Sequence, residues 1–120
     1  MVFIGKSKVF SLVQEQQYET VGQFWDEMAA LYGLENLQGL GYLWQGDQFS
    51  YAIGLKHGTV PGHNVQITLP DDGWESVTGQ TDRLKALYDE LYRSGPLQFE
   101  IETFFQDGTC HVRYYRAGKP

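Results

Sequence analysis

The chain has 120 residues, which suits one compact domain with a core of its own. Its 15 acidic against 9 basic residues give a formal net charge of −6, which repels nucleic-acid phosphates and favours cationic partners. The sequence has no apolar run of membrane-spanning length, no signal-peptide pattern, and one cysteine, Cys110, which excludes an internal disulfide framework. We therefore expect a single domain over residues 1–120 in the reducing cytoplasm, without membrane association or direct nucleic-acid binding.

The first predicted elements are a strand over residues 8–14 and a helix over residues 20–32. Apolar side chains recur in this helix at intervals of three and four residues, as on one buried helical face. These side chains belong to Val21, Phe24, Trp25, Met28, Leu31 and Tyr32. Thr20 is the expected N-cap, and Gly33 is the expected end of the helix.

Alternating side chains after this helix predict a hairpin with strands over residues 40–44 and 49–55 and a turn at Gly46-Asp47. A loop rich in Gly and Pro, from His57 to His63, leads to a short strand over residues 65–69. A turn at residues 70–73 then precedes a short extended segment over residues 74–78.

A second helix is predicted over residues 82–92, again from its periodic apolar side chains. These belong to Leu84, Leu87, Tyr88, Leu91 and Tyr92, and we interpret the two tyrosines mainly as packing residues. Thr81 is the expected N-cap, and Ser94-Gly95-Pro96 ends the helix. Residues 97–105 and 109–115 flank a turn and form a second hairpin.

The order strand, helix, hairpin thus occurs twice. The tetrapeptide Trp25-Asp26-Glu27-Met28 in the first helix is similar to Tyr88-Asp89-Glu90-Leu91 in the second. We predict an α+β fold of two β-α-β-β units with pseudo-twofold symmetry, in which two helices cover one face of an antiparallel sheet.

Aromatic residues make up 15% of the chain, as seven Phe, eight Tyr and three Trp. This content is consistent with an aromatic core or with the wall of a ligand pocket, and composition alone does not separate the two.

Several segments, in this order and spacing, resemble the gyrase-inhibitor-like (GyrI-like) effector-binding domain, which is fused to some AraC-type and MerR-type regulators and also occurs alone. The matching segments are Phe24-Trp25, Tyr32-Gly33, Tyr51-Ala52-Ile53-Gly54, Val60-Pro61, Leu69-Pro70-Asp71-Asp72-Gly73-Trp74, Leu87-Tyr88, Ser94-Gly95-Pro96 and Phe99-Glu100. The resemblance covers roughly residues 9–115. It implies two β-α-β-β units and a stand-alone module that binds cationic, aromatic compounds.

The resemblance also implies that Glu100 is the acid of the pocket. From alternation alone, Gln98, Glu100 and Glu102 share one strand face, and the residues by themselves favour a polar face toward solvent with the apolar core on the opposite face. Many relatives have tyrosine where this chain has Glu102, so Glu102 is either a second pocket acid or a solvated residue.

The expected aromatic wall consists of Trp74, Tyr115, Trp25, Tyr51 and Tyr42. Aromatic faces attract cations and stack on flat ligands. Trp25 and Tyr51 are equally compatible with ordinary core positions.

Several other chemistries lack support in the sequence. His57, His63 and His111 have no metal-ligand spacing with one another or with Cys110, and no cofactor is expected. Cys110 and His111 are adjacent on a strand and point to opposite faces, so they form no nucleophile pair. Residues 39–41 (Gly-Leu-Gly) lack the third glycine of a dinucleotide loop.

Three functions remain open. The favoured one is a non-enzymatic module that senses or sequesters cationic aromatic drugs or metabolites. A hydrolase of strained or toxic small molecules, with Glu100 as its carboxylate, is the alternative implied by some stand-alone relatives. An inhibitory protein that acts on a macromolecule is the third. A separate regulator protein or a second copy of the chain is a further expected partner.

Overall fold

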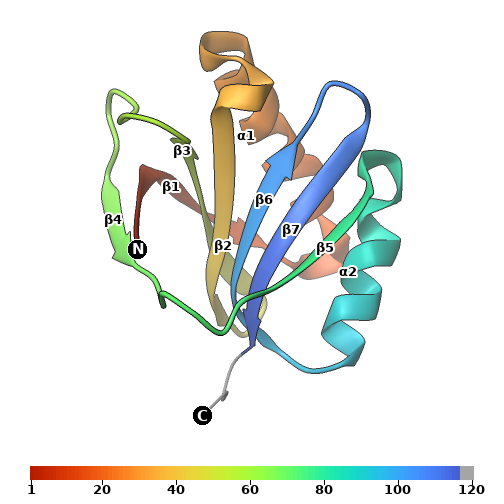
Figure 1. Ribbon diagram of the computed structural model, residues 1–120. Helices are drawn as coiled ribbons and strands as arrows, with labels where there is room; N and C mark the ends of the chain where they lie inside the picture. The colour runs from red at the N-terminus through yellow and green to blue at the C-terminus, as the bar shows by residue number, and fades with distance from the viewer. Residues whose placement is uncertain (117–120) are drawn as a thin grey trace.

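The computed structural model describes residues 1–116, which form an α+β fold with one antiparallel sheet of seven strands and two helices (Figure 1). The strands are β1 (Val2–Ser11), β2 (Leu37–Gln45), β3 (Gln48–Leu55), β4 (Val65–Thr68), β5 (Glu75–Gln80), β6 (Leu97–Phe104) and β7 (Thr109–Arg116). The helices are α1 (Gln17–Tyr32) and α2 (Leu84–Arg93). The predicted α+β class, antiparallel sheet and both hairpins are confirmed.

The strand order is β4-β1-β3-β2-β6-β7-β5, so strands far apart in the sequence meet at the centre of the sheet. There β2 pairs with β6, and Gly39 lies opposite Glu102 while Gly41 lies opposite Glu100. Paired residues of antiparallel strands point to the same face. The two glutamates therefore share a face with two positions that have no side chain.

The first helix begins earlier than its periodicity indicates. Its N-cap is Gln16, and Thr20 lies inside the helix, where its hydroxyl donates to the Gln16 carbonyl at 3.1 Å. The predicted cap at Thr20 is therefore wrong. The predicted end at Gly33 is confirmed: its φ of +87° suits glycine, and its N–H donates to the Ala29 carbonyl.

The strand predicted over residues 8–14 also lies earlier in the chain, as β1. Residues after Ser11 leave the sheet and form a short 3-10 turn (Val13–Glu15), in which Gln14 has a φ of +53°. Thr81 belongs to a 3-10 turn (Thr81–Arg83), and no side chain caps α2, so that predicted cap is wrong as well.

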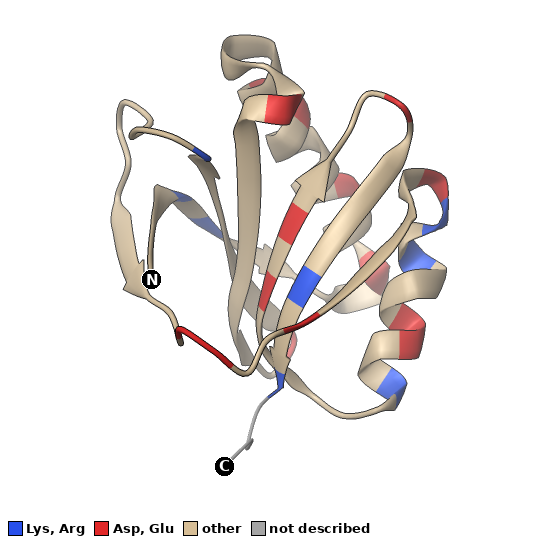
Figure 2. Ribbon diagram, viewed as in Figure 1, with Lys and Arg blue, Asp and Glu red and all other residues tan. Residues whose placement is uncertain are grey.

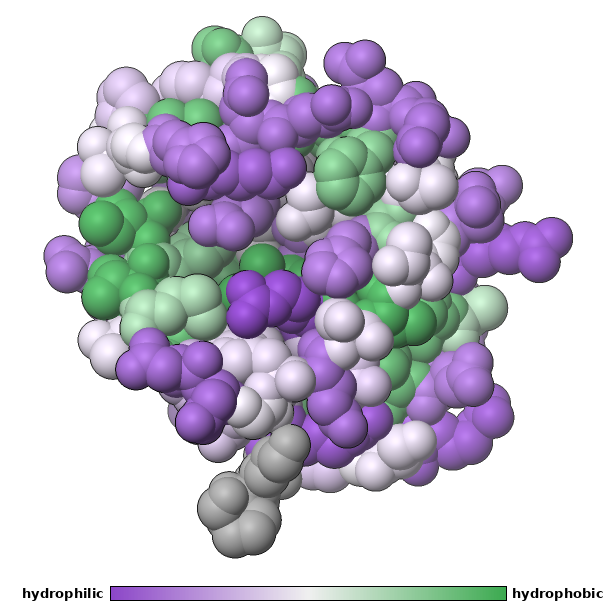
Figure 3. Space-filling model, viewed as in Figure 1, coloured by the Kyte–Doolittle hydropathy of each residue, from purple (hydrophilic) through white to green (hydrophobic). Residues whose placement is uncertain are grey.

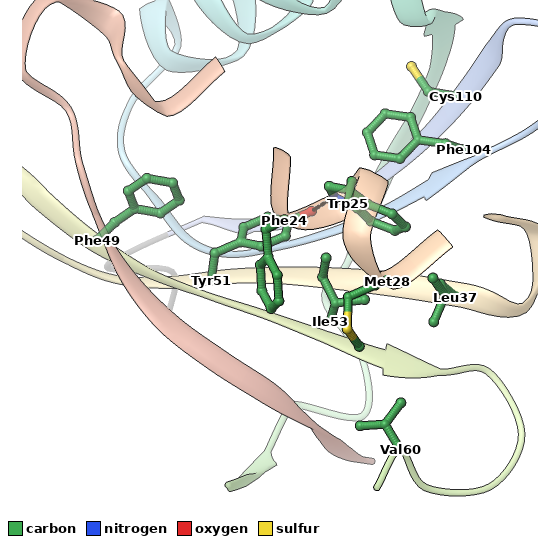
Figure 4. Packing of buried hydrophobic residues seen from close by; sticks show 10 residues of the cluster. All are labelled: Phe24, Trp25, Met28, Leu37, Phe49, Tyr51, Ile53, Val60, Phe104 and Cys110. Carbon is green, nitrogen blue, oxygen red and sulfur yellow. Dashed lines mark hydrogen bonds between the residues drawn. The ribbon is translucent and has the colours of Figure 1, made fainter. Parts of the chain in front are cut away.

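Both helices pack on the same face of the sheet (Figure 1). Trp25 of α1 contacts Tyr51 on β3, and Tyr88 of α2 contacts Glu102 on β6. The main core lies between α1 and the sheet (Figure 4). It comprises Phe24, Trp25, Met28, Leu37, Phe49, Tyr51, Ile53, Val60, Phe104 and Cys110.

The other face of the sheet carries a second apolar cluster. Its buried members are Phe3, Leu40, Tyr42, Ala52, Leu69 and Ile101. The connection from β4 to β5 supplies Leu69 and Trp74 to this cluster. Figure 3 shows this face, where hydrophobic side chains form separate patches among polar ones. Neither helix within residues 1–116 has the length and apolar character needed to span a bilayer.

Candidate functional site

A cavity of about 670 Å³ lies between the two helices and the sheet, a volume typical of small-molecule sites. Its lining comes from both helices, from β2, β3 and β6, and from the turns beside them. Among the lining residues are Leu12, Gln17, Tyr18, Val21, Gly22, Trp25, Leu34, Trp44, Phe49, Tyr51, Leu84, Tyr88, Tyr92, Glu100, Glu102, Phe104 and Phe105. Apolar and aromatic side chains therefore surround two acids.

Glu100 and Glu102 form the floor of this cavity, and each is only 4% exposed. Figure 2 shows acidic positions within the sheet on β6, whereas most others lie on helices and turns. Gly39 and Gly41 make room for this arrangement. A methyl group at Gly39 would overlap the Tyr51 side chain, and one at Gly41 would lie 2.8 Å from Glu100 Oε1.

A chain of hydrogen bonds crosses the floor from α1 to α2. The Trp25 indole N–H donates to the Tyr51 hydroxyl at 2.9 Å, and Tyr51 in turn donates to Glu102 Oε1. The Tyr88 hydroxyl donates to Glu102 Oε2 at 2.6 Å. Both oxygens of Glu102 are therefore satisfied by tyrosines, which hold this carboxyl in a fixed orientation.

Glu100 is held less completely. The Tyr92 hydroxyl donates to Glu100 Oε2 at 3.2 Å, which is long for a hydroxyl donor. Tyr92 is 40% exposed as a whole residue, whereas burial raises the pKa of its hydroxyl, so the exposed part of Tyr92 is not its hydroxyl end. Glu100 is accordingly the carboxyl with capacity left for a ligand.

Both carboxyls resist ionisation. Burial raises the pKa of Glu100 well above its ordinary value, and the neighbouring charge of Glu102 raises it further, while the hydrogen bond from Tyr92 lowers it. Burial also raises the pKa of Glu102, and the bonds from Tyr51 and Tyr88 lower it. The bonding pattern makes Glu102 the more easily ionised member and Glu100 the one that keeps a proton.

Neither carboxyl has a cationic partner among residues 1–116, where the ion pairs involve other acids. Lys85 lines the cavity, but its ammonium group binds Asp89 at 2.8 Å and Glu15 at 3.2 Å. A ligand cation would therefore meet an acidic floor with no protein cation in competition.

The aromatic walls have defined ring geometry. Trp25 meets Phe104 edge-on at 4.8 Å between ring centroids, and Trp44 stacks on Phe49 at 5.8 Å. Phe49 also meets Tyr51 edge-on at 6.2 Å. These contacts fix the rings in place, so the cavity has a preformed shape for a flat ligand.

The structure brings together four of the seven residues predicted for the site. Glu100, Glu102, Trp25 and Tyr51 all line the cavity. The solvated interpretation of Glu102 is thereby excluded, and Trp25 and Tyr51 belong to both core and cavity.

The remaining three predicted wall residues lie on the opposite face of the sheet. Tyr42 and Tyr115 both pair with Phe99, which points away from Glu100. Trp74 packs against Phe99 and Tyr115 in the same aromatic group, at 6.3 and 5.7 Å. Tyr42 instead shares a 2.6 Å hydrogen bond with Ser7.

Tyr88 and Tyr92 were interpreted from the sequence mainly as packing residues, whereas their hydroxyls bind the two carboxyls. Helical periodicity placed their rings on the inner face of α2 and carried no information about what faced them. The choice of tyrosine over phenylalanine at these inward-facing positions indicated a polar partner, because a buried hydroxyl needs a hydrogen bond.

The cavity does not have the ligands of a metal centre. Among residues 1–116 no group of three His, Cys, Asp or Glu side chains is arranged to bind a metal ion. Cys110 is buried, and burial raises the pKa of its thiol, so it is not an activated nucleophile.

Fold and site together define an α+β protein with a preformed, aromatic-lined cavity over a buried pair of carboxyls. Comparison of the chain with protein-family models, with curated proteins and with solved structures finds no match.

Proposed function

We propose that this protein binds small organic cations with a flat aromatic part in the cavity between its helices and its sheet. The observation that carries the proposal is the pair Glu100 and Glu102, buried on the cavity floor without a basic partner among residues 1–116. A buried carboxylate without a counter-charge is unfavourable, and a bound cation removes that penalty. A neutral ligand gives no such compensation.

The rest of the cavity supports the same ligand class. Ring faces attract cations and stack on planar groups, typically by about 0.5–2 kcal/mol each. The formal net charge of −6 adds a long-range field that attracts cations and repels nucleic acids. The aromatic walls then select ligands by shape, and the two glutamates of the floor select them by charge.

The architecture behind the site is, in our proposal, two β-α-β-β units related by a pseudo-twofold axis. In support, β1, β3 and β2 are neighbours in the same pattern as β5, β7 and β6, and the two groups join through β2 and β6. This arrangement agrees with the resemblance to the gyrase-inhibitor-like effector-binding domain. The proposed role is sensing or sequestration of the cation in the cytoplasm, with any signal passed to a separate regulator protein or a second copy of the chain.

Calorimetry with a matched cation and neutral compound tests the proposal. We suggest 2-naphthylmethylammonium and 2-naphthylmethanol, which share the ring and differ in charge. The cation should bind more tightly, and Glu100→Gln should weaken it by roughly tenfold while leaving the alcohol unchanged or bound more tightly. Glu90→Gln, on the exposed side of α2, is the charge-matched control. Equal binding of cation and alcohol would overturn the proposal.

Hydrolysis is a second candidate, favoured by one observation: a carboxyl pair in which tyrosines orient one member, while the other has a raised pKa and acts as a general base once it has released its proton. Recovery of the ligand by mass spectrometry separates the two functions. A binding protein returns the compound unchanged, whereas a hydrolase yields a product that depends on Glu100.

A further inference from the structure

The floor of the cavity has hydrogen-bond acceptors to spare and few free donors. The buried hydroxyls of Tyr51 and Tyr88 donate to Glu102, and the Trp25 indole N–H donates to Tyr51. Tyr92 donates to Glu100. A hydroxyl has one proton and the indole one N–H, so these four donors are fully used.

Once Glu100 has released its proton to bind a cation, one of its carboxylate oxygens remains without a donor. Glu100 Oε1 accepts no hydrogen bond within residues 1–116, and it lies beside Gly41, where a methyl group would be 2.8 Å from it. Among the described side chains, the one enclosed polar atom without a hydrogen bond is Gln17 Oε1. Glu100 Oε1 is not such an enclosed atom, and Glu100 lines the cavity, so this oxygen remains accessible from the cavity.

The Gln17 oxygen adds to this imbalance from the α1 side. Gln17 lines the same cavity; its Oε1 is shielded from solvent and accepts no hydrogen bond, while the nitrogen of the same amide carries two N–H donors. The neighbouring Tyr18 hydroxyl both donates and accepts, so it does not select between ligand types. Two acceptors that line the cavity, Gln17 Oε1 and the ionised Glu100 carboxylate, therefore have room for a donor from the ligand.

We propose, as a refinement that rests on the proposed function, that the ligand is a cation with at least one N–H, such as a protonated amine, amidine or guanidine, rather than a fully alkylated onium ion. An N–H donor supplies both the charge and the hydrogen bond that Glu100 Oε1 lacks. A quaternary ammonium supplies charge alone and leaves that oxygen without a donor in an enclosed site.

This assignment separates two contributions of the site. The aromatic walls and the acidic floor attract any organic cation of suitable size, through stacking and charge. The open oxygen of Glu100 requires a directional donor. Hydrogen bonds to charged groups are worth enough to separate the two cation types by roughly tenfold to a hundredfold in affinity.

The test is a methylation series on one aromatic group, measured by calorimetry with the wild-type protein. The probes are 2-naphthylmethylammonium, its N-methyl, N,N-dimethyl and N,N,N-trimethyl derivatives, and 2-naphthylmethanol. The ammonium compound and its three methylated derivatives are all cations at neutral pH, and among these four only the N,N,N-trimethyl compound has no N–H. We expect affinity to change little through the dimethyl compound and to fall at least tenfold at the last methylation.

A steady loss with each added methyl group would indicate that size, not the N–H, determines binding, and would overturn the assignment. A trimethyl cation that binds as tightly as the dimethyl one would do the same, while leaving cation binding itself intact. If the alcohol binds as tightly as the amines, the proposed function fails as well. The alcohol therefore distinguishes failure of the function from failure of this refinement.

A variant provides the second measurement. Glu100→Met keeps a similar length but removes the acceptor, so the ratio between dimethyl and trimethyl affinities should approach one. A ratio that stays at its wild-type value in Glu100→Met would assign the selectivity to another group. Glu90→Met, on the exposed side of α2, should keep the wild-type ratio.

Discussion

Gly41 lies directly opposite Glu100 on the neighbouring central strand, and a methyl group on its Cα would lie 2.8 Å from Glu100 Oε1. This glycine leaves space for the buried carboxyl and keeps its open oxygen uncovered. Its backbone conformation is not one that only glycine adopts, because no positive φ occurs there. The absence of a side chain, rather than backbone freedom, is the property that the site requires.

Gly41→Ala should therefore weaken cation binding by at least tenfold, because the new methyl group displaces or covers Glu100 Oε1. Overpacking should also lower the free energy of unfolding by about 1–3 kcal/mol. Titration of 2-naphthylmethylammonium and urea denaturation measure the two effects. Gly79→Ala is the matched control, since its Cβ would meet only Leu87 at 3.4 Å. Unchanged affinity in Gly41→Ala would contradict the placement of the ligand beside Glu100.

The tyrosines on α2 should differ in their effect on stability. Tyr88→Phe leaves Glu102 Oε2 without its 2.6 Å donor in a fully buried place, and should lower the free energy of unfolding by about 1–3 kcal/mol. Tyr92→Phe removes a bond of 3.2 Å from a ring that is 40% exposed, and should cost less than about 1 kcal/mol. Denaturation midpoints of the two variants compare these effects directly; equal losses would show that Tyr88 and Tyr92 support the floor to the same degree.

Local patterns predicted most of the elements correctly. Periodic apolar side chains located α1 and α2, and strand alternation placed Glu100 and Glu102 on one face of β6. Such patterns depend only on neighbours in the chain. The start of β1 was missed because Lys6, Ser7 and Lys8 interrupt its apolar run.

The site was harder to predict because it depends on which strand faces meet. Tyr115 looked like a wall residue beside Glu100, but the β6–β7 register pairs it with Phe99 and pairs Tyr114 with Glu100. A shift of one residue in register exchanges the two faces of a strand. Trp74 followed the same wrong assignment, since it packs on Tyr115. The register of β6 against β7 could not be predicted from the sequence.

Helix α1 contains a glycine, Gly22, with open space beside it. A methyl group there would have no heavy atom within 4 Å, and the residue borders the cavity. Gly22→Ala should therefore raise the free energy of unfolding by about 0.5–1 kcal/mol, as expected inside a helix. Gly33→Ala, where φ is +87°, should lower it instead. Thermal denaturation measures whether each variant is more or less stable than the wild type. A loss of stability in Gly22→Ala would mean that other side chains fill the space beside Gly22.

The stability of the protein should depend on pH through Glu100. Burial, the charge of Glu102 and the bond from Tyr92 together leave the pKa of Glu100 well above its ordinary value of 4.5. The folded protein therefore holds this proton at pH values where the unfolded chain has lost it. Stability from this group is fully present below about 4.5 and declines as pH rises through the folded pKa. The free energy of unfolding of the empty protein should fall over that window, by at most about 1.4 kcal/mol per pH unit for one proton.

Cation binding should show the opposite slope. An ionised Glu100 binds the cation, so affinity should rise with pH through the same window, and binding should release a proton to the buffer. Urea denaturation at several pH values, with calorimetry in buffers of different ionisation enthalpy, measures both slopes. In Glu100→Gln both should become shallower, with the contribution of Glu102 remaining, whereas Glu90→Gln should keep them. The lowered pKa values of Asp71 and Asp107 act in a different window, because their stabilising effect is lost only as pH falls below their ordinary value of 3.8. If Glu100→Gln retained the full slopes, the proton would belong to another group of the floor, and Glu102 would be the first to substitute.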